Sequence, residues 1–156
     1  SYIHKDSANL TKDEFEKILS GDYRFLMKKE NPLCQEFYYE CMANLYRPKV
    51  IVDYEREPLI FPEGDVRITF DMNVRAAVGG WDIFDPELPV LSVLDPGMMV
   101  LEVKFTEFIP DMIKKLIPLD GQEFSAISKY TLCYEQAHHM TDLMAGISKT
   151  NRRRGI

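Results

Sequence analysis

The clearest pattern of hydrophobic and polar positions runs from Val66 to Arg75. Apolar and polar residues alternate strictly here, and successive side chains of a strand point to opposite faces of a sheet. One face would carry Val66, Ile68, Phe70, Met72 and Val74, and the other Arg67, Thr69, Asp71, Asn73 and Arg75. The polar face either meets solvent, as the outer face of an antiparallel sheet commonly does, or lines a polar cavity.

Further strands are predicted on both sides of this one. The β-branched run 50–52 leads into Tyr54 and Arg56, and the alternation of residues 98–105 places Glu102 and Lys104 on one face. Residues 90–94 form a short candidate strand. Turn signals at 62–65, 79–80 and 95–97 separate these segments.

Helical patterns flank the strands. Thr11 and Glu14 have the spacing of a capping box and Gly21 can end a helix, which predicts a helix between Thr11 and Gly21. Further helices are predicted over about 33–46, 110–118 and 125–144. We therefore expect an α+β fold with a small antiparallel sheet flanked by helices. One domain is expected over residues 1–156, with helices in 1–48, strands in 49–107, helices in 108–148 and a basic tail in 149–156.

Length and composition narrow the class of protein. The chain has 156 residues, enough for one hydrophobic core and too few for two ordinary domains. Its formal charge of −6 argues against a protein that coats nucleic acid, so no specific nucleic-acid partner is expected. No membrane segment or signal pattern is evident, which favours a cytoplasmic location. The three cysteines lack metal-ligand spacing and are interpreted as buried or incidental thiols.

Four short motifs follow one another along the chain. They are Tyr54-x-Arg56, Val66-Arg67-Ile-x-Phe-Asp71, Leu101-Glu102-Val-Lys104-Phe and Ser128-Lys129-Tyr130. In order, spacing and hydrophobic context they resemble the polyphosphate polymerase (VTC) domain family of the triphosphate tunnel (CYTH-like) superfamily. The resemblance implies that the antiparallel sheet forms part of a closed β-barrel. Nothing before Lys49 resembles the first strands of the family, so the chain is expected to be the C-terminal part of such a domain.

The resemblance also implies a function. Polymerases of this family transfer the terminal phosphoryl group of a nucleoside triphosphate to a polyphosphate chain inside a basic tunnel that holds a divalent cation. By motif position, Arg56 and Arg67 would hold phosphate oxygens, Glu102 would bind Mg²⁺ or Mn²⁺, and Lys129 would lie at the reacting phosphate. Arg75 and Lys104, on the strands of Arg67 and Glu102, are further candidates for phosphate binding.

The residues by themselves leave alternatives open. Arg56 could pair with Glu55 or Asp53 at the surface, and Glu102 and Lys104 could neutralise each other without a metal. The function could be that of a non-catalytic module that binds polyanions or assists assembly, or that of a triphosphate hydrolase, in which water is the acceptor. For the chain alone, without the opening strands, we expect no turnover of triphosphate. Exposed sheet edges are expected to promote a homo-oligomer.

Overall fold

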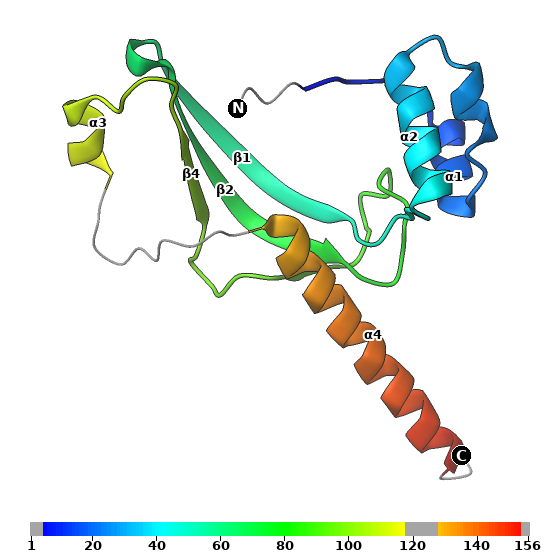
Figure 1. The fold of residues 1–156 in the computed structure, drawn as a ribbon. Helices are drawn as coiled ribbons and strands as arrows, with labels where there is room; N and C mark the ends of the chain where they lie inside the picture. The colour runs from blue at the N-terminus through cyan, green and yellow to red at the C-terminus, as the bar shows by residue number, and fades with distance from the viewer. Residues whose placement is uncertain (1–4, 118–127, 154–156) are drawn as a thin grey trace. The chain divides into compact units, whose positions relative to one another are not determined.

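The computed structural model describes residues 5–117 and 128–153, with side chains as far as residue 142. The chain divides into two compact units, Ser1–Lys49 and Val50–Ile156 (Figure 1). The first unit is helical, and the second combines an antiparallel sheet with helices. The α+β prediction is confirmed, while the prediction of one domain stays a prediction.

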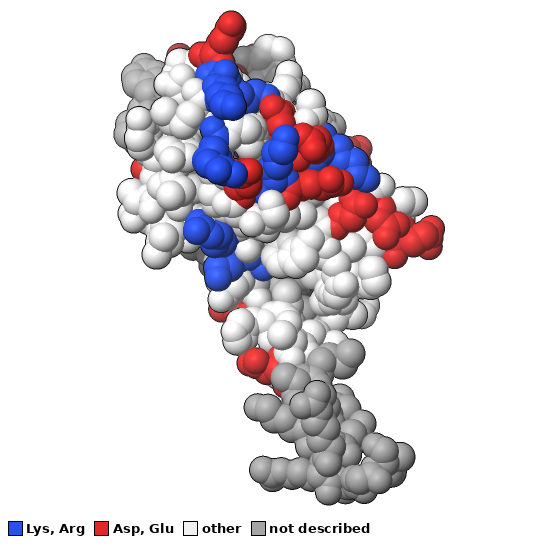
Figure 2. All heavy atoms as spheres, turned by 90° about the vertical axis from the view of Figure 1, so that its right-hand side faces the viewer, with Lys and Arg blue, Asp and Glu red and all other residues white. Residues whose placement is uncertain are grey.

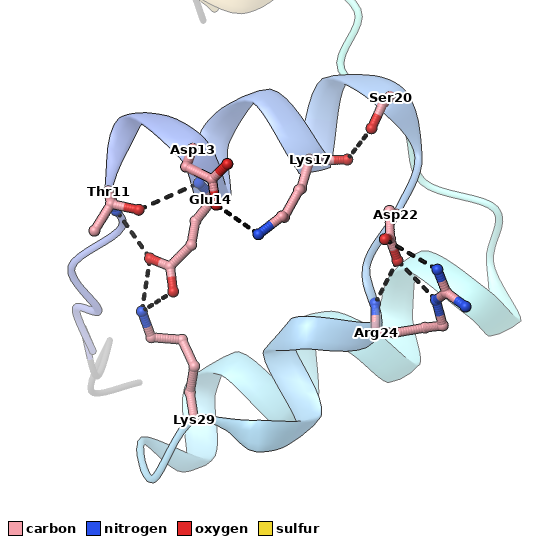
Figure 3. A network of polar contacts seen from close by, with 8 residues as sticks. All are labelled: Thr11, Asp13, Glu14, Lys17, Ser20, Asp22, Arg24 and Lys29. Carbon is pink, nitrogen blue, oxygen red and sulfur yellow. Dashed lines mark hydrogen bonds and ion pairs between the residues drawn. The ribbon is translucent and has the colours of Figure 1, made fainter.

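The first helix of the helical unit, α1 (Lys12–Ser20), is defined by its caps. The Glu14 backbone N–H donates to Thr11 Oγ1 at 3.2 Å, and the Thr11 N–H donates to Glu14 Oε2 at 2.9 Å, which confirms the capping box. Gly21 ends the helix with a φ of 82°. Figure 3 shows Lys29 reaching back to Glu14, with Nζ 2.7 Å from Oε1. This ammonium lowers the pKa of the Glu14 carboxyl.

The rest of the helical unit consists of the 3-10 helix η1 (Arg24–Lys28) and α2 (Pro32–Ala43). Helix α2 ends before the predicted end at residue 46, because Leu45 takes a left-handed φ of 55°. The core of this unit is formed by Ile18, Tyr23, Leu26, Cys34 and Cys41. These residues come from all three helices and the α1–η1 connection, so their burial holds the unit together.

The second unit is built around a four-stranded antiparallel sheet. Its elements are β1 (Val52–Phe61), the 3-10 turn η2 (Glu63–Asp65), β2 (Val66–Ala77), β3 (Val90–Ser92), β4 (Val100–Lys104), α3 (Asp111–Leu116) and α4 (Lys129–Arg153). Strand β2 is central: β1 pairs along one edge, and β4 and β3 pair with successive parts of the other. The described strands form an open sheet, and the closed barrel implied by the resemblance is not confirmed.

A bulge interrupts the alternation in β2. Asp53 pairs with Arg75 but Glu55 pairs with Met72, so β2 contributes one residue more than β1 in this interval. Asn73 lies within it, with a φ of 51°. Asparagine tolerates this left-handed conformation better than most residues do.

The bulge corrects part of the predicted face assignment. Because an extra residue reverses the side-chain direction, residues after Asn73 point to the face opposite to the predicted one. Val74, expected beside Val66, lies instead on the face of Asp71. Arg75, expected on the face of Arg67, lies on the opposite face.

Helices pack on both faces of the sheet. On one face, Ile113 of α3 is buried against Val66 and neighbouring apolar residues of β2 and β4. On the other, Cys133 of α4 is buried against Val74 and Ala76. The three cysteines are free and buried, as predicted, and burial raises the pKa of the Cys133 thiol. The sheet therefore has two separate apolar clusters, one under α3 on one face of β2 and one under α4 on the opposite face.

The last helix differs from its prediction at its C-terminal end. Helix α4 continues to Arg153 instead of ending near Met144, so most of the segment predicted as a basic tail is helical in its backbone. The sequence between Lys129 and Arg153 contains no proline and one glycine, Gly146, which fits an uninterrupted helix. Residues 154–156 and the predicted helix start at Ser125 lie outside the described residues.

Charged side chains of both signs are mixed on the surface. In the upper part of the face that Figure 2 draws, lysine and arginine side chains lie among aspartate and glutamate side chains. This mixing agrees with a formal charge of −6 and gives that face no single basic patch of the kind that attracts nucleic acid. Within the described residues, no helix combines the length and apolar character needed to cross a membrane.

Gly64, in the turn between β1 and β2, provides a test of this fold. Its φ is +75°, and a Cβ there would overlap the backbone carbonyl oxygen of Phe108. Gly97 has a similar φ of +82°, but the space that a side chain would occupy is open. We expect Gly97→Ala to cost about 1 kcal/mol of unfolding free energy through backbone strain alone. Gly64→Ala should cost clearly more, measured by urea denaturation, and equal losses would contradict the close approach of Phe108.

Candidate functional site

The pairing of β1, β2 and β4 gathers the candidate residues on one face of the sheet. Asp71 of β2 lies opposite Arg56 of β1, and Arg67 lies opposite Lys104 of β4. Thr69, between them on β2, lies opposite Glu102. Directly opposed residues share a face in an antiparallel pair, and residues two apart on a strand do so as well. Arg56, Arg67, Glu102 and Lys104 therefore share the face of Asp71.

The Asp71 carboxylate is the centre of this face. Arg56 donates to it twice, from Nε to Oδ1 at 2.6 Å and from Nη2 to Oδ2 at 2.7 Å. Lys129, the first residue of α4, places its Nζ 2.7 Å from Oδ2. The Asp71 side chain is fully buried, while those of Arg56 and Lys129 are 33% and 20% exposed. One buried carboxylate thus joins two cations that remain accessible to solvent.

Tyr54 completes the cluster. It precedes Arg56 by two residues on β1 and so points to the same face. Its ring centre lies 5.1 Å from the Arg56 guanidinium carbon and 5.3 Å from Lys129 Nζ. Both distances fall within the range of cation–π attraction. The ring therefore forms an apolar wall beside both cations and helps to fix their positions.

The electrostatics follow from this geometry. The Arg56 guanidinium, with Lys129, lowers the pKa of the buried Asp71 carboxyl to about 2. The hydrogen bonds to Asp71 in turn raise the pKa of Arg56, and the charge of Glu102 adds to this effect. Asp71 and Arg56 are therefore both charged at neutral pH. Two positive charges and one negative charge leave the cluster of Arg56, Lys129 and Asp71 with one net positive charge.

Glu102 lies on the same face but has a different partner. Its Oε1 is 3.1 Å from Lys104 Nζ, and the Thr69 hydroxyl is 3.5 Å from its Oε2, at the outer limit of a hydrogen bond. Glu102 and Lys104 thus form an ion pair, which agrees with the alternative in which the two side chains neutralise each other. That pair is 39% exposed at Glu102 and 69% at Lys104, so its net contribution to stability is small.

Among the described residues of these strands, Glu102 is the partly exposed carboxylate on this face that could bind a metal. The described residues contain no group of three or more histidine, cysteine, aspartate or glutamate side chains arranged around a common point. Mg²⁺ and Mn²⁺ are often held by one or two carboxylates together with the phosphates of a substrate. Glu102 fits this shared type of site and does not fit a closed protein cage.

Arg67 and Arg75 are placed very differently. Within the described part of the chain, the Arg67 side chain makes no hydrogen bond or ion pair, and it is exposed on the Asp71 face. Arg75 lies on the opposite face, with Nη2 2.5 Å from Asp53 Oδ2. The prediction that Arg75 shares a face with Arg67 is wrong. The bulge at Asn73 adds one residue to β2, so the side chains after it point to the opposite face.

Asp71 and Tyr54 lie within the sequence motifs, but the sequence alone assigns neither of them a role. The pairing of Asp71 with Arg56 has a signal in the hairpin: residues 62–65 form the turn, so Phe61 opposes Val66 and Arg56 opposes Asp71. The contact with Lys129 has no such signal, because the start of α4 is far away in sequence. The alternative in which Arg56 pairs with Glu55 or Asp53 is wrong, since its partner is Asp71.

A protein-family model matches most of this chain. The family model described as VTC domain matches residues 1–138, which covers most of the chain and all of the cluster around Asp71. Neither curated proteins nor solved structures gave a significant match.

The buried Asp71 carboxylate leads to a prediction about acid stability. A carboxyl whose pKa falls from 3.8 to about 2 on folding stabilises the native state fully above the unfolded pKa. This stabilisation, about 2 kcal/mol, is lost as the pH falls through about 2. Urea denaturation between pH 7 and pH 2 should therefore show a steeper acid loss of unfolding free energy for the wild type than for Asp71→Asn. Parallel curves for the two proteins would contradict the assignment.

Proposed function

The chain belongs to the VTC domain family, and on that premise we propose that it is part of a polyphosphate-forming phosphotransferase. The reaction would move the terminal phosphoryl group of a nucleoside triphosphate onto the end of a polyphosphate chain. The observation that supports this proposal best is the convergence of Arg56 and Lys129 on buried Asp71, on the sheet face that also carries Arg67.

Arg56 and Arg67 are the proposed phosphate ligands. A guanidinium has five N–H donors in a planar fork, and Arg56 uses two of them on Asp71. The remaining donors are available to phosphate oxygens, for which arginine is well suited. Arg67 has no partner among the described residues and can offer its whole fork. Lys104 is a further candidate on this face, whereas Arg75 is left out of the proposed site because it lies on the other face.

Lys129 is the proposed catalytic residue. Phosphoryl transfer depends mainly on alignment of the reacting groups and on positive charge beside the transferred oxygens. The Lys129 ammonium uses one N–H on Asp71, which fixes its position and leaves two donors for a phosphoryl group. Its place at the first residue of α4, beside the Tyr54 ring, restricts the side chain further.

Glu102 is the proposed ligand of a divalent cation, Mg²⁺ or Mn²⁺, shared with the substrate phosphates. When bound, such an ion would neutralise part of the charge on the phosphate oxygens. Glu102 would then exchange its contact with Lys104 for the ion, which would free the Lys104 ammonium for phosphate. This exchange requires little reorganisation, because both side chains are partly exposed.

A second candidate function is a module that binds polyanions without turnover. The open sheet favours it, since a phosphate chain on an open face is less enclosed than one inside a barrel. The two functions differ in whether ATP is consumed in the presence of Mn²⁺ when the opening strands implied by the family resemblance are also present. We expect the chain by itself to bind tripolyphosphate and not to turn over ATP. Labelled polyphosphate as the product would establish the polymerase, and free phosphate alone would indicate hydrolysis.

We also propose that the protein forms a homo-oligomer through its sheet edges. Within the described residues, β1 pairs only with β2, so its outer edge has unpaired backbone groups. Ile60 on this strand is 69% exposed. An unpaired edge of this kind favours association with another chain. Light scattering over a range of concentrations should give a mass above that of one chain, and a monomer at every concentration would contradict the proposal.

The proposed phosphate ligands lead to a binding prediction. Arg67→Ala should weaken tripolyphosphate binding about tenfold or more, because a charge-assisted hydrogen bond contributes roughly 1.5 to 3 kcal/mol. Calorimetry measures this change directly. Binding by the wild type should also weaken as salt rises, since contacts of exposed cations are screened.

Two controls sharpen that experiment. Arg75→Ala removes an arginine from the same strand but from the opposite face, and it should leave the dissociation constant unchanged. Removal of the arginines at 152–154 tests whether the C-terminal cluster binds the polyanion instead. If either control weakens binding more than Arg67→Ala does, the assignment of the site to the Asp71 face is wrong.

A further inference from the structure

We propose that Asp71 acts as an internal counter-anion that limits the affinity of Arg56 and Lys129 for phosphate. The inference rests on the proposed function, because it concerns the same phosphate site. It adds a role for a residue that is neither a phosphate ligand nor a metal ligand in that proposal. Asp71 is buried beneath the two cations and would not touch the substrate.

Charge is the first way in which Asp71 opposes a phosphate. Without Asp71, Arg56 and Lys129 would present two positive charges to a polyanion. With Asp71 they present one, and the negative charge lies within 2.7 Å of a nitrogen of each cation. A phosphate that binds Arg56 and Lys129 must approach this buried carboxylate and is repelled by it, in surroundings that screen charge less than bulk water does.

Asp71 also opposes phosphate binding in a second way, by competing for the hydrogen-bond donors of Arg56 and Lys129. The carboxylate accepts from Arg56 Nε, Arg56 Nη2 and Lys129 Nζ, and the last two share Oδ2. These N–H groups point toward Asp71 and are not available to a phosphate unless the cluster opens. Asp71 therefore competes for donors as well as opposing the charge of the ligand. A phosphate is left with the outward-pointing donors of both cations.

Such a competition suits a site that handles a polymer. A chain of phosphates that must advance past a site needs contacts strong enough to align it and weak enough to release it. Interactions that bind the ground state and the transition state equally do not raise the turnover rate. A fixed counter-anion lowers ground-state affinity while it holds both cations in place, so successive units of one polymer can be bound and released.

The experiment uses calorimetry with tripolyphosphate on the 156-residue chain. Asp71→Asn keeps the shape of the side chain and removes its charge. We expect the dissociation constant to fall about three- to tenfold, from the repulsion of charges a few ångströms apart near a protein surface. The salt dependence of binding should become steeper as well. A purely structural role for Asp71 would have the opposite result, because loss of order around Arg56 and Lys129 would weaken binding.

Asp53→Asn is the matched control. It removes one negative charge from the same sheet, also from an arginine ion pair, but on the face opposite to Asp71. This variant should bind tripolyphosphate as the wild type does. Tighter binding by both variants would mean that only the total charge matters, and the inference about Asp71 would be wrong.

A charge cycle keeps the test decisive if Asp71→Asn alone fails to fold. Lys129→Gln leaves Arg56 and Asp71 with no net charge, and the double variant Asp71→Asn/Lys129→Gln restores one positive charge. The double variant should bind tripolyphosphate more tightly than Lys129→Gln. Weaker or equal binding would overturn the inference while leaving the proposed function standing. If wild type and every variant fail to bind, the proposed function itself is wrong and the inference falls with it.

Discussion

The sharing of one buried carboxylate by two cations is the interaction on which this sheet face depends. Asp71 has no exposure to solvent, and a buried charge is stable only if it is paired and hydrogen-bonded. Arg56 satisfies it from the neighbouring strand and Lys129 from helix α4. The same contacts therefore anchor the start of α4 on the sheet and hold two basic groups side by side at its surface. Cations that would otherwise repel each other are kept together by the charge beneath them.

The bulge at Asn73 decides which residues accompany that cluster. Before the bulge, β2 directs Asp71 toward α4, and after it the strand directs Val74 and Ala76 to the same side. A regular strand would have placed the polar Arg75 under the helix. The extra residue instead gives α4 an apolar surface next to a polar one. The bulge thus lies between the charged residues at the start of α4 and the apolar residues against which α4 packs.

Much of this arrangement could be predicted from local patterns. The caps at Thr11 and Gly21 mark α1, and the alternation from Val66 to Asp71 assigns the correct faces, because both signals depend on neighbours in sequence. The order of the four short motifs, on the strands and at the start of α4, also identifies the family. The cap and alternation signals share one property, which is that each involves residues within or directly beside a single element.

Sequence patterns miss features that depend on contacts between separate elements or on an unusual backbone conformation. The bulge requires a comparison of two strands, and no residue type alone marks its position, although Asn73 permits it. The contact between Asp71 and Lys129 joins residues far apart in sequence, so the alternation places Asp71 on a polar face without showing what neutralises it. Helix α2 ends early because Leu45 adopts a backbone conformation that its residue type does not favour.

The most direct test of the central claim is a crystal structure of the chain with tripolyphosphate and Mn²⁺. We predict phosphate density on the Asp71 face, within hydrogen-bonding distance of Arg56, Arg67 and Lys129, with the contact between Asp71 and Arg56 retained. Phosphate bound only beside Arg75, or only at the C-terminal arginines, would contradict this prediction.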